Sequence, residues 1–304
     1  MPVIEVRGLR KTYGDKVAVD DVSLTVEPGE VYGVLGRNGA GKTTTVEAVA
    51  GLRNPDAGTL SVLGLDPRRD RARVRQILGV QLQDAELHSA LTVHELVRLH
   101  RSFYRGGADP EELIDRVGLT DRRRTRFENL SGGQQQRLNI ALALVGRPRV
   151  VILDELTTGL DPEARRGMWA MVERLRDGGV TVMLVSHHME EVERLCDRVA
   201  LIDKGRVAAV DTPAGLIARS GLDQQVRFRT AEPFDTAVLD RLDEVDAVRL
   251  DGDQVVATGS GNLLHAVSTA LVGAGVTALD TRFERATLED AFLTLTGSRF
   301  DGEA

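Results

Sequence analysis

An apolar run that leads into a glycine-rich loop and then a helix-like run constrains this chain more than any other segment. The loop, residues 36–43, reads Gly-Arg-Asn-Gly-Ala-Gly-Lys-Thr and fits the pattern G-x-x-x-x-G-K-[ST]. Residues 31–35 precede it like a strand and residues 44–50 follow it like a helix, which is the context that a phosphate-binding loop requires. Glycines let backbone N–H groups approach phosphate oxygens, and the helix N-terminus adds partial positive charge. The sequence therefore predicts a nucleoside triphosphate site.

The residues of this loop divide the expected contacts with the nucleotide. We expect Lys42 to reach the β- and γ-phosphates and the Thr43 hydroxyl to ligate Mg²⁺. Lys42 is one of only four lysines among 39 basic residues, so this chain otherwise favours arginine. The compact ammonium of lysine suits a phosphate-binding loop better than the wide planar guanidinium. The predicted nucleotide contacts of the loop are Gly36, Asn38, Gly39, Ala40, Gly41, Lys42, Thr43 and Thr44.

Composition limits the class of protein. The 304 residues are 42% apolar and 28% charged, a globular balance with room for one large domain or two ordinary ones. A net charge of −7 argues against a general nucleic-acid binder. The single cysteine, Cys196, excludes an intramolecular disulfide and fits a reducing compartment. We find no apolar signal core and no run near the ~18 apolar residues of a membrane span, so we expect another chain to supply any membrane spans.

Short apolar runs alternate with helix-like segments through the first two thirds of the chain. Residues 150–153 and 180–185 are typical of parallel strands, and the stretch 162–176 between them is helix-like. Helices are predicted near 92–104 and 110–117, within a helix-rich region of about 84–145. We therefore expect an α/β core with a parallel sheet and a helical subdomain over residues 1–217.

The sequence pattern changes after about residue 217. Residues 226–229 alternate like a strand, and residues 248–250 and 255–257 flank Asp-Gly-Asp, which is a hairpin signal. Residues 234–242 and 263–272 are helix-like, residues 276–279 strand-like, and Thr287 is expected to cap a last helix. We predict a small C-terminal α+β domain, 218–304, without a catalytic pattern.

Two further motifs place polar side chains at the end of a predicted strand and at the start of a predicted helix. Asp154 and Glu155 end an apolar strand, where Asp154 fits a Mg²⁺ ligand and Glu155 fits a base that orients the attacking water. Ser131, Gly132, Gly133 and Gln134 precede a helix, and Ser131 is predicted to cap it beside exposed backbone N–H groups. That is a second anion site, which one triphosphate does not need from the same chain.

With these motifs in order, residues 3–217 resemble the ATP-binding subunits of ABC transporters. Tyr13 matches the aromatic residue that stacks on adenine, and Gln83 matches the glutamine that contacts Mg²⁺ and faces the membrane subunit. Residues 131–134 match the family signature, Asp161 matches the loop that crosses to the partner subunit, and His187 matches the switch histidine at the γ-phosphate. We interpret the neighbouring His188 as solvated. The family usually has proline after the catalytic glutamate, whereas this chain has Leu156, which loosens a constraint on Glu155.

The resemblance implies a P-loop ABC ATPase that binds ATP and Mg²⁺ and works as a homodimer. Each ATP is expected between one chain's phosphate loop and the other chain's Ser131-Gly132-Gly133. A separate permease would hold the protein at the cytoplasmic face of the membrane. The C-terminal segment 286–293 resembles the drug-exporter branch, including daunorubicin-type resistance ATPases, which implies export of a drug, antibiotic or lipid-like substrate.

Alternatives remain at this point. A soluble ABC ATPase of DNA repair or translation is the competing interpretation, although such proteins often carry two cassettes, zinc motifs or long coiled coils. The arginine-rich stretches 68–75 and 122–126 are compatible with nucleic acid, but they contain no interleaved aromatic residues. We interpret them as solvated faces or partner contacts and expect no nucleic-acid partner.

Overall fold

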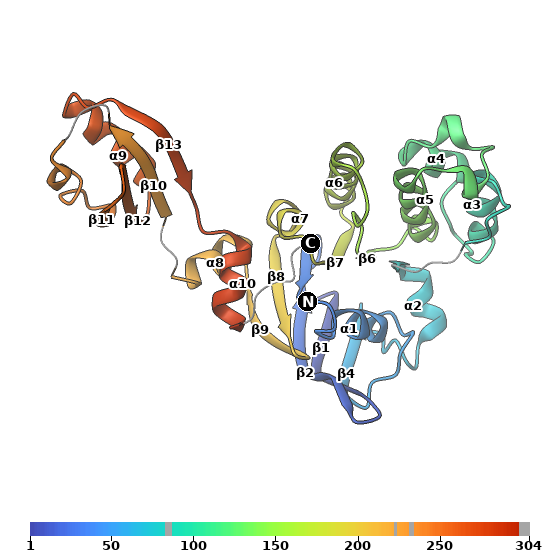
Figure 1. The fold of residues 1–304 in the computed structure, drawn as a ribbon. Helices are drawn as coiled ribbons and strands as arrows, with labels where there is room; N and C mark the ends of the chain where they lie inside the picture. The colour runs from blue at the N-terminus through green and yellow to red at the C-terminus, as the bar shows by residue number, and fades with distance from the viewer. Residues whose placement is uncertain (83–86, 222–223, 231–233, 298–304) are drawn as a thin grey trace. The chain divides into compact units, whose positions relative to one another are not determined.

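The chain divides into two compact units, Met1–Ala214 and a second that begins at Gly215. The structure is a computed structural model that describes residues 1–82, 87–221, 224–230 and 234–297 (Figure 1). The first unit is an α/β domain and the second is a smaller α+β domain, as the sequence predicted.

A six-stranded sheet, in the order β5-β6-β7-β3-β8-β9, forms the centre of the first unit. Its members are β3 (Val31–Leu35), β5 (Leu78–Gln81), β6 (Val150–Asp154), β7 (Thr181–Ser186), β8 (Arg198–Asp203) and β9 (Arg206–Asp211). All neighbours pair in parallel except β8 and β9, which form an antiparallel edge. Every residue of β3, β6 and β7 is buried, which explains their uninterrupted apolar sequences. The prediction of a parallel sheet is confirmed.

An antiparallel sheet lies on the other side of the phosphate-loop helix. It consists of β2 (Lys16–Val26), β1 (Ile4–Tyr13) and β4 (Ala57–Val62), in that order. The helix α1 (Lys42–Val49) contacts all three strands. Buried side chains of both sheets and of α1 form one continuous core, which includes Val6, Val34, Val46 and Ile152.

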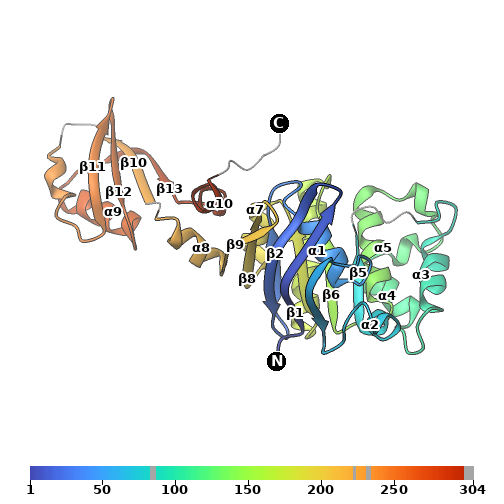
Figure 2. The same cartoon turned by 90° about the horizontal axis from the view of Figure 1, so that it is seen from below.

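Helices cluster at the edge of the parallel sheet that carries β5. The helices α3 (Val93–Arg101), α4 (Pro110–Arg116) and α5 (Gly132–Leu144) contact one another, and α2 (Arg71–Ile77) precedes β5. Figure 2 shows α3, α4 and α5 beyond β5 and β6, at the opposite edge from β9, and Figure 1 also shows these helices on the far side of β6 from β9. Thr92 and Asp109 cap α3 and α4 with their side chains, which fixes where these helices begin. The helices predicted near 92–104 and 110–117 are confirmed.

Two further helices complete the first unit. The helix α6 (Pro162–Asp177) connects β6 to β7 and packs on β7, confirming the helix predicted over 162–176. The helix α7 (Met189–Leu195) follows β7 and contacts β7, β3 and α6.

The second unit is an antiparallel sheet with a helix on one face. The sheet order is β11-β12-β10-β13, from β10 (Gln224–Thr230), β11 (Val245–Asp251), β12 (Gln254–Gly259) and β13 (Ala278–Glu284). The helix α9 (Leu263–Gly273) packs on β10 and β12, where Phe228, Val255 and Leu271 are part of a common core. The remaining helices are α8 (Pro213–Arg219), which spans the boundary between the units, and α10 (Leu288–Thr296).

Most predictions for this unit are confirmed, and one is wrong. The hairpin β11–β12 turns at Gly252, which has φ +64°, and Thr287 caps α10 in a capping box with Asp290. The helix predicted over residues 234–242 is only a 3₁₀ turn, Thr236–Val238. The apolar side chains of this segment, Phe234, Leu239 and Leu242, pack into the core of this unit from an irregular backbone, so tertiary packing overrides the local helical pattern.

No described helix is long and apolar enough to cross a membrane.

The core of the second unit generates a stability prediction. We expect Phe228→Ala to lower the free energy of unfolding of this unit by about 3–5 kcal/mol, because Phe228 is fully buried and its removal leaves a cavity. Hydrogen exchange of β10 and β12 measures the loss. Leu250→Ala is the matched control on the same sheet, since Leu250 is 70% exposed. Equal losses in the two variants would contradict the assignment of Phe228 to the core.

Candidate functional site

The phosphate loop between β3 and α1 is shaped by close backbone approaches that only glycine allows. A Cβ on Gly36 would lie 2.2 Å from the carbonyl oxygen of Ile202. Gly41, the N-cap of α1, has φ +103°, and a Cβ there would lie 2.5 Å from the carbonyl oxygen of Ala18. The loop thus lies against β8 of the parallel sheet on one side and against β2 of the antiparallel sheet on the other. The N-terminus of α1 is left open to a ligand.

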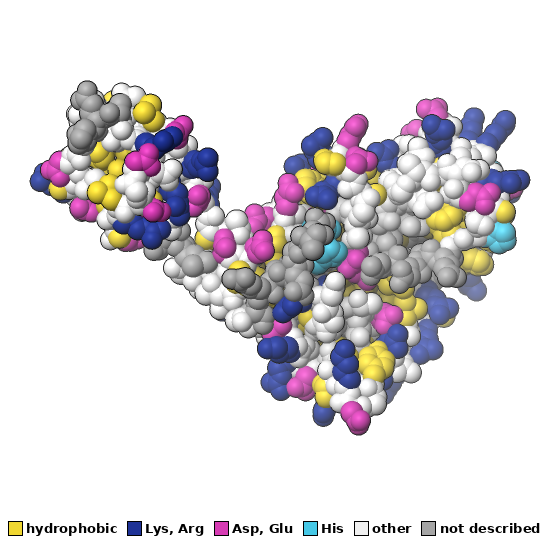
Figure 3. All heavy atoms as spheres, viewed as in Figure 1, with side chains coloured by type: hydrophobic (Ala, Val, Ile, Leu, Met, Phe, Trp, Pro, Cys, Tyr) yellow, Lys and Arg dark blue, Asp and Glu magenta, His cyan; other side chains and the backbone are white. Residues whose placement is uncertain are grey.

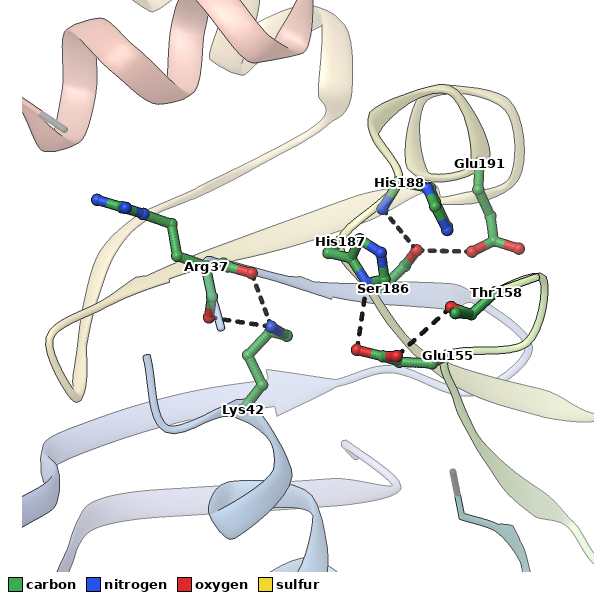
Figure 4. Close-up of polar contacts among 9 residues, drawn as sticks. Arg37, Lys42, Glu155, Thr158, Ser186, His187, His188 and Glu191 are labelled. Carbon is green, nitrogen blue, oxygen red and sulfur yellow. Dashed lines mark hydrogen bonds and ion pairs between the residues drawn. The ribbon is translucent and has the colours of Figure 1, made fainter. Parts of the chain in front are cut away.

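Lys42 lies inside the curve of this loop. Its ammonium donates hydrogen bonds to the carbonyl oxygens of Gly36 and Arg37, at 2.7 and 3.1 Å (Figure 4). The side chain is only 5% exposed, and this burial lowers the pKa of Lys42, while the carboxylates of Glu155 and Asp154 act to raise it. The carboxylates of Glu155 and Asp154 are therefore close enough to the ammonium to favour its charged form.

A pocket of about 380 Å³ opens beside the loop. Its lining residues are Tyr13, Lys16, Ala18, Asn38, Gly39, Gly41, Lys42, Thr43, Thr44 and Glu155. The structure thus brings together Tyr13 and most of the contacts predicted for the phosphate loop, whereas Gly36 and Ala40 of the same loop are buried and do not line the pocket. Lys16 and Ala18 were not predicted. Their only sequence signal is their position shortly after Tyr13.

Tyr13 lies at the end of β1 and is 40% exposed. The Arg53 guanidinium lies 5.3 Å from the centre of its ring, and the Lys11 ammonium lies 5.6 Å from it. Arg53 is also bonded to Glu47 on α1, at 2.5 Å. These contacts hold the aromatic ring at the pocket beside the phosphate-loop helix, and Arg53 was not predicted from the sequence.

The two acids at the end of β6 have different surroundings. Asp154 is 1% exposed, at the last position of the strand. Glu155 has a left-handed backbone, φ +50°, and its N–H donates to the carbonyl oxygen of Val185 at 2.9 Å. The Thr158 hydroxyl donates to Oε2 of Glu155 at 3.4 Å. A non-glycine residue with this φ is uncommon, and such residues are over-represented at functional sites.

His187 meets Glu155 across the sheet edge. Its Nδ1 lies 3.2 Å from Oε1 of Glu155, and because a carboxylate only accepts, Nδ1 carries the proton in this contact (Figure 4). The rings of His187 and His188 lie 4.1 Å apart, and both residues are half-buried. The interpretation of His188 as solvated is therefore wrong, because its ring packs against that of His187.

The segment of Ser131 is separate from the pocket. Ser131 accepts the N–H of Gln134 at 3.4 Å, and the Gln134 side chain accepts the Ser131 N–H at 3.0 Å, which forms a capping box on α5. The cap predicted for Ser131 is confirmed. Gly132 is exposed, and a Cβ on Gly133 would lie 3.2 Å from Cβ of Ala164 on α6. Among the described residues that line the pocket of Lys42, none comes from 131–134.

Asp161 and Gln83 are the last two of the site residues predicted from the sequence. The carboxylate of Asp161 accepts the N–H groups of Glu163 and Ala164, both at 2.9 Å, and so caps α6. These bonds lower the pKa of Asp161. Asp161 does not line the pocket of Lys42. Gln83 lies outside the described residues, so its place is not part of this geometry.

The donor set suits a hard cation. Thr43 offers a hydroxyl and Asp154 a carboxylate, and Mg²⁺ prefers oxygen ligands of these types. No group of three or more His, Cys, Asp or Glu residues forms a metal cage in the part of the chain that the structure describes. This donor set fits Mg²⁺, which usually keeps several waters and takes one or two protein ligands together with phosphate oxygens.

The arginine-rich stretch 122–126 is partly compensated by acids. Arg123 lies 3.6 Å from Glu111, and Arg126 lies 3.9 Å from Glu128. Basic and acidic side chains are interspersed over the face seen in Figure 3.

Comparison with known proteins agrees with this geometry. Residues 19–158 match the family described as ABC transporter. The daunorubicin resistance ATP-binding protein DrrA3 of Streptomyces coeruleorubidus is 40% identical, over 97% of this chain and 96% of that protein. The Nod factor export ATP-binding protein I of Burkholderia lata is 43% identical, over 71% of this chain and 74% of that protein. A solved structure, described as an ATP-binding subunit of an ABC transporter, superposes with a TM-score of 0.66 at 28% identity, over 72% of this chain and 93% of that one. The chain belongs to the ABC transporter family and is an ATP-binding cassette, with the ATPase activity of that family.

Proposed function

We propose that this protein hydrolyses ATP to drive an exporter whose membrane-spanning part is a separate permease. The observation that carries the proposal is the convergence of Lys42, Glu155 and Tyr13 on one pocket, with His187 3.2 Å from Glu155. A phosphate cradle, an aromatic platform and a carboxylate beside a histidine are the groups that hydrolysis of a bound triphosphate requires.

Each side chain has a distinct role in this proposal. Tyr13 stacks on the adenine, and Lys42 with the loop N–H groups offsets the charge of the phosphates. Mg²⁺, held by Thr43, Asp154 and Gln83, would neutralise charge on the phosphate oxygens. Glu155 accepts a proton from the attacking water, and His187, held by Glu155, contacts the γ-phosphate.

The complete site requires a second copy of the chain. The N-terminus of α5 at Ser131 presents backbone N–H groups and a hydroxyl whose proton remains available, because Ser131 acts only as an acceptor in its cap. This surface and Asp161 lie apart from the pocket of Lys42. We infer a two-fold homodimer in which Ser131, Gly132, Gly133 and Gln134 of one copy close the ATP site of the other. ATP then holds the dimer together, and hydrolysis opens it.

Export through a permease is inferred from relatives and from an exposed surface. The relatives above are named for daunorubicin resistance and Nod factor export, which favours a drug, antibiotic or lipid-like substrate. Leu99 on α3 and Phe103, two residues after the helix ends, are 44% and 64% exposed, and two large apolar side chains this close in the chain fit a protein contact. The permease would hold the protein at the cytoplasmic face of the membrane. We assign ATP binding to residues 1–217 and a regulatory or dimer-stabilising role to residues 218–304.

Removing the proposed base tests the hydrolytic mechanism. We expect Glu155→Gln to retain ATP binding, to lower the hydrolysis rate about 10²–10⁴-fold, and to accumulate a closed dimer, since the amide is a far weaker proton acceptor. Steady-state hydrolysis and size-exclusion chromatography with ATP measure both effects. Glu163→Gln, on the exposed first turn of α6, is the control with the same change of charge. An undiminished rate in Glu155→Gln would remove Glu155 as the base.

Mixing two inactive variants tests the shared site. Lys42→Ala disables the loop of its own chain, and Ser131→Arg disables the surface that it offers to a partner. In a mixed dimer one site carries both changes and the other carries neither, so an equal mixture should recover about a quarter of the wild-type rate. Each variant alone should stay inactive. Absence of recovery, with mixed dimers verified by two affinity tags, would contradict a site built from two copies.

Isolation from membranes tests the permease. We expect the tagged protein, captured from native membranes in mild detergent, to carry a stoichiometric multi-span protein identified by mass spectrometry. Leu99→Asp together with Phe103→Asp should reduce its recovery without affecting ATP binding, because the charges oppose burial at the contact. Recovery of ribosomal or DNA-repair proteins instead would contradict the transporter assignment.

A further inference from the structure

A carboxyl group that the proposed mechanism does not use lies directly behind the site. Glu191, in the first turn of α7, is 0% exposed. Burial raises the pKa of Glu191 above its usual value. The Ser186 hydroxyl opposes this rise most, followed by Thr157, Trp169 and the charge of Arg165. Enclosing a carboxyl group is costly unless hydrogen bonds compensate it. An acid in the first turn is attracted by the N-terminus of α7, but this attraction does not require burial. Glu190, in the same turn, has the same attraction and is exposed.

The strongest contact of Glu191 leads to the loop of His187. The N–H of His188 donates to Oγ of Ser186 at 3.0 Å, and the Ser186 hydroxyl donates to Oε2 of Glu191 at 2.7 Å (Figure 4). A serine hydroxyl has one proton, so the bond that it accepts from His188 leaves this proton for Glu191. Glu191 thereby orients Ser186, which holds the backbone of His188. His187 lies between these two anchored residues.

The other side of the same carboxyl faces the segment of Glu155. Thr157 is fully buried two residues after Glu155, and its hydroxyl, with the indole of Trp169 on α6, faces Glu191 without a hydrogen bond of ordinary geometry. The left-handed backbone of Glu155, φ +50°, is strained and persists only where the surroundings hold it. Glu191 is therefore bonded to the loop of His187 through Ser186, and it lies near Thr157 in the segment that follows Glu155.

We propose that Glu191 is a positioning residue for ATP hydrolysis, which fixes the loop of His187 by its hydrogen bond with Ser186. This inference rests on the roles proposed above for His187 and Glu155. Its action is on the chemical step alone, because the contacts of Glu191 lie behind the pocket and not in the phosphate loop or at Tyr13.

Four variants of the full-length protein test this role by their kcat and KM for ATP. Ser186→Ala removes the hydroxyl, and Glu191→Met removes the acceptor at similar volume. Both should lower kcat about 10- to 100-fold with KM within about twofold, since a small displacement of reacting groups has an effect of this size. Glu191→Gln keeps an acceptor oxygen for Ser186 and should retain most of kcat. Glu190→Ala, on the same turn, is the control and should match the wild type.

A double-variant comparison separates positioning from a general loss of folding. If Ser186 acts through His187, Ser186→Ala should have no further effect on the single-turnover rate in a His187→Ala background. The proposal would be overturned if Ser186→Ala lowered the single-turnover rate of His187→Ala by the same factor as that of the wild type. It would also be overturned if the variants changed KM instead of kcat, or if Glu191→Gln and Glu191→Met lost equal activity. Should Glu191→Met fail to fold, Ser186→Ala and the double variant still decide. Full rates in both His187→Ala and Glu155→Gln would instead overturn the proposed function, which distinguishes the two failures.

Discussion

The parallel pairing of β6, β7 and β3 is the constraint on which the site depends. Parallel strands that are neighbours in a sheet end at the same edge, so the residues after them meet there whatever their distance in sequence. In this sheet Leu35 pairs with Ser186 and Asp154 pairs with Val185. The phosphate loop, the two acids and the switch histidine therefore emerge side by side. The burial of these strands on both faces leaves their ends as the place where polar groups can reach a ligand.

The same topology keeps the Ser131 segment away from the phosphate loop of its own chain. The helix that Ser131 caps belongs to the cluster beyond β5, whereas the phosphate loop follows β3, and β7, β6 and β5 lie between them in the sheet. The order of the strands thus separates the N-terminus of α1 from that of α5 within one chain, and this separation is the reason for proposing that the two meet across a homodimer. The capping box stiffens the Ser131 surface while the serine proton remains available, so this surface is ordered before a phosphate arrives.

Much of this could be predicted because glycine-rich loops, caps and apolar strands are local signals. The loop at Lys42, the cap at Ser131 and the strand before Asp154 each follow from a few neighbouring residues. The failures are tertiary. The helix predicted over 234–242 gives way to packing on a sheet, and His188 is covered by a ring from its neighbour. Glu191 stands beside Glu190 in an acidic run that is typical of a solvated helix face, and only the fold shows which of the two acids is buried.

The leucine at position 156 links these observations. Proline there would remove an N–H and restrict the backbone of the preceding Glu155. Leu156 leaves that backbone unrestricted and instead contributes a fully buried side chain. The left-handed conformation of Glu155 must then be held by its contacts, which are the carbonyl oxygen of Val185, the Thr158 hydroxyl and the His187 ring. In the proposed mechanism Glu155 is a base that its neighbours hold in place, so the placement of those neighbours affects the rate. This is the physical reason for proposing that Glu191, behind the loop of His187, positions the reacting groups.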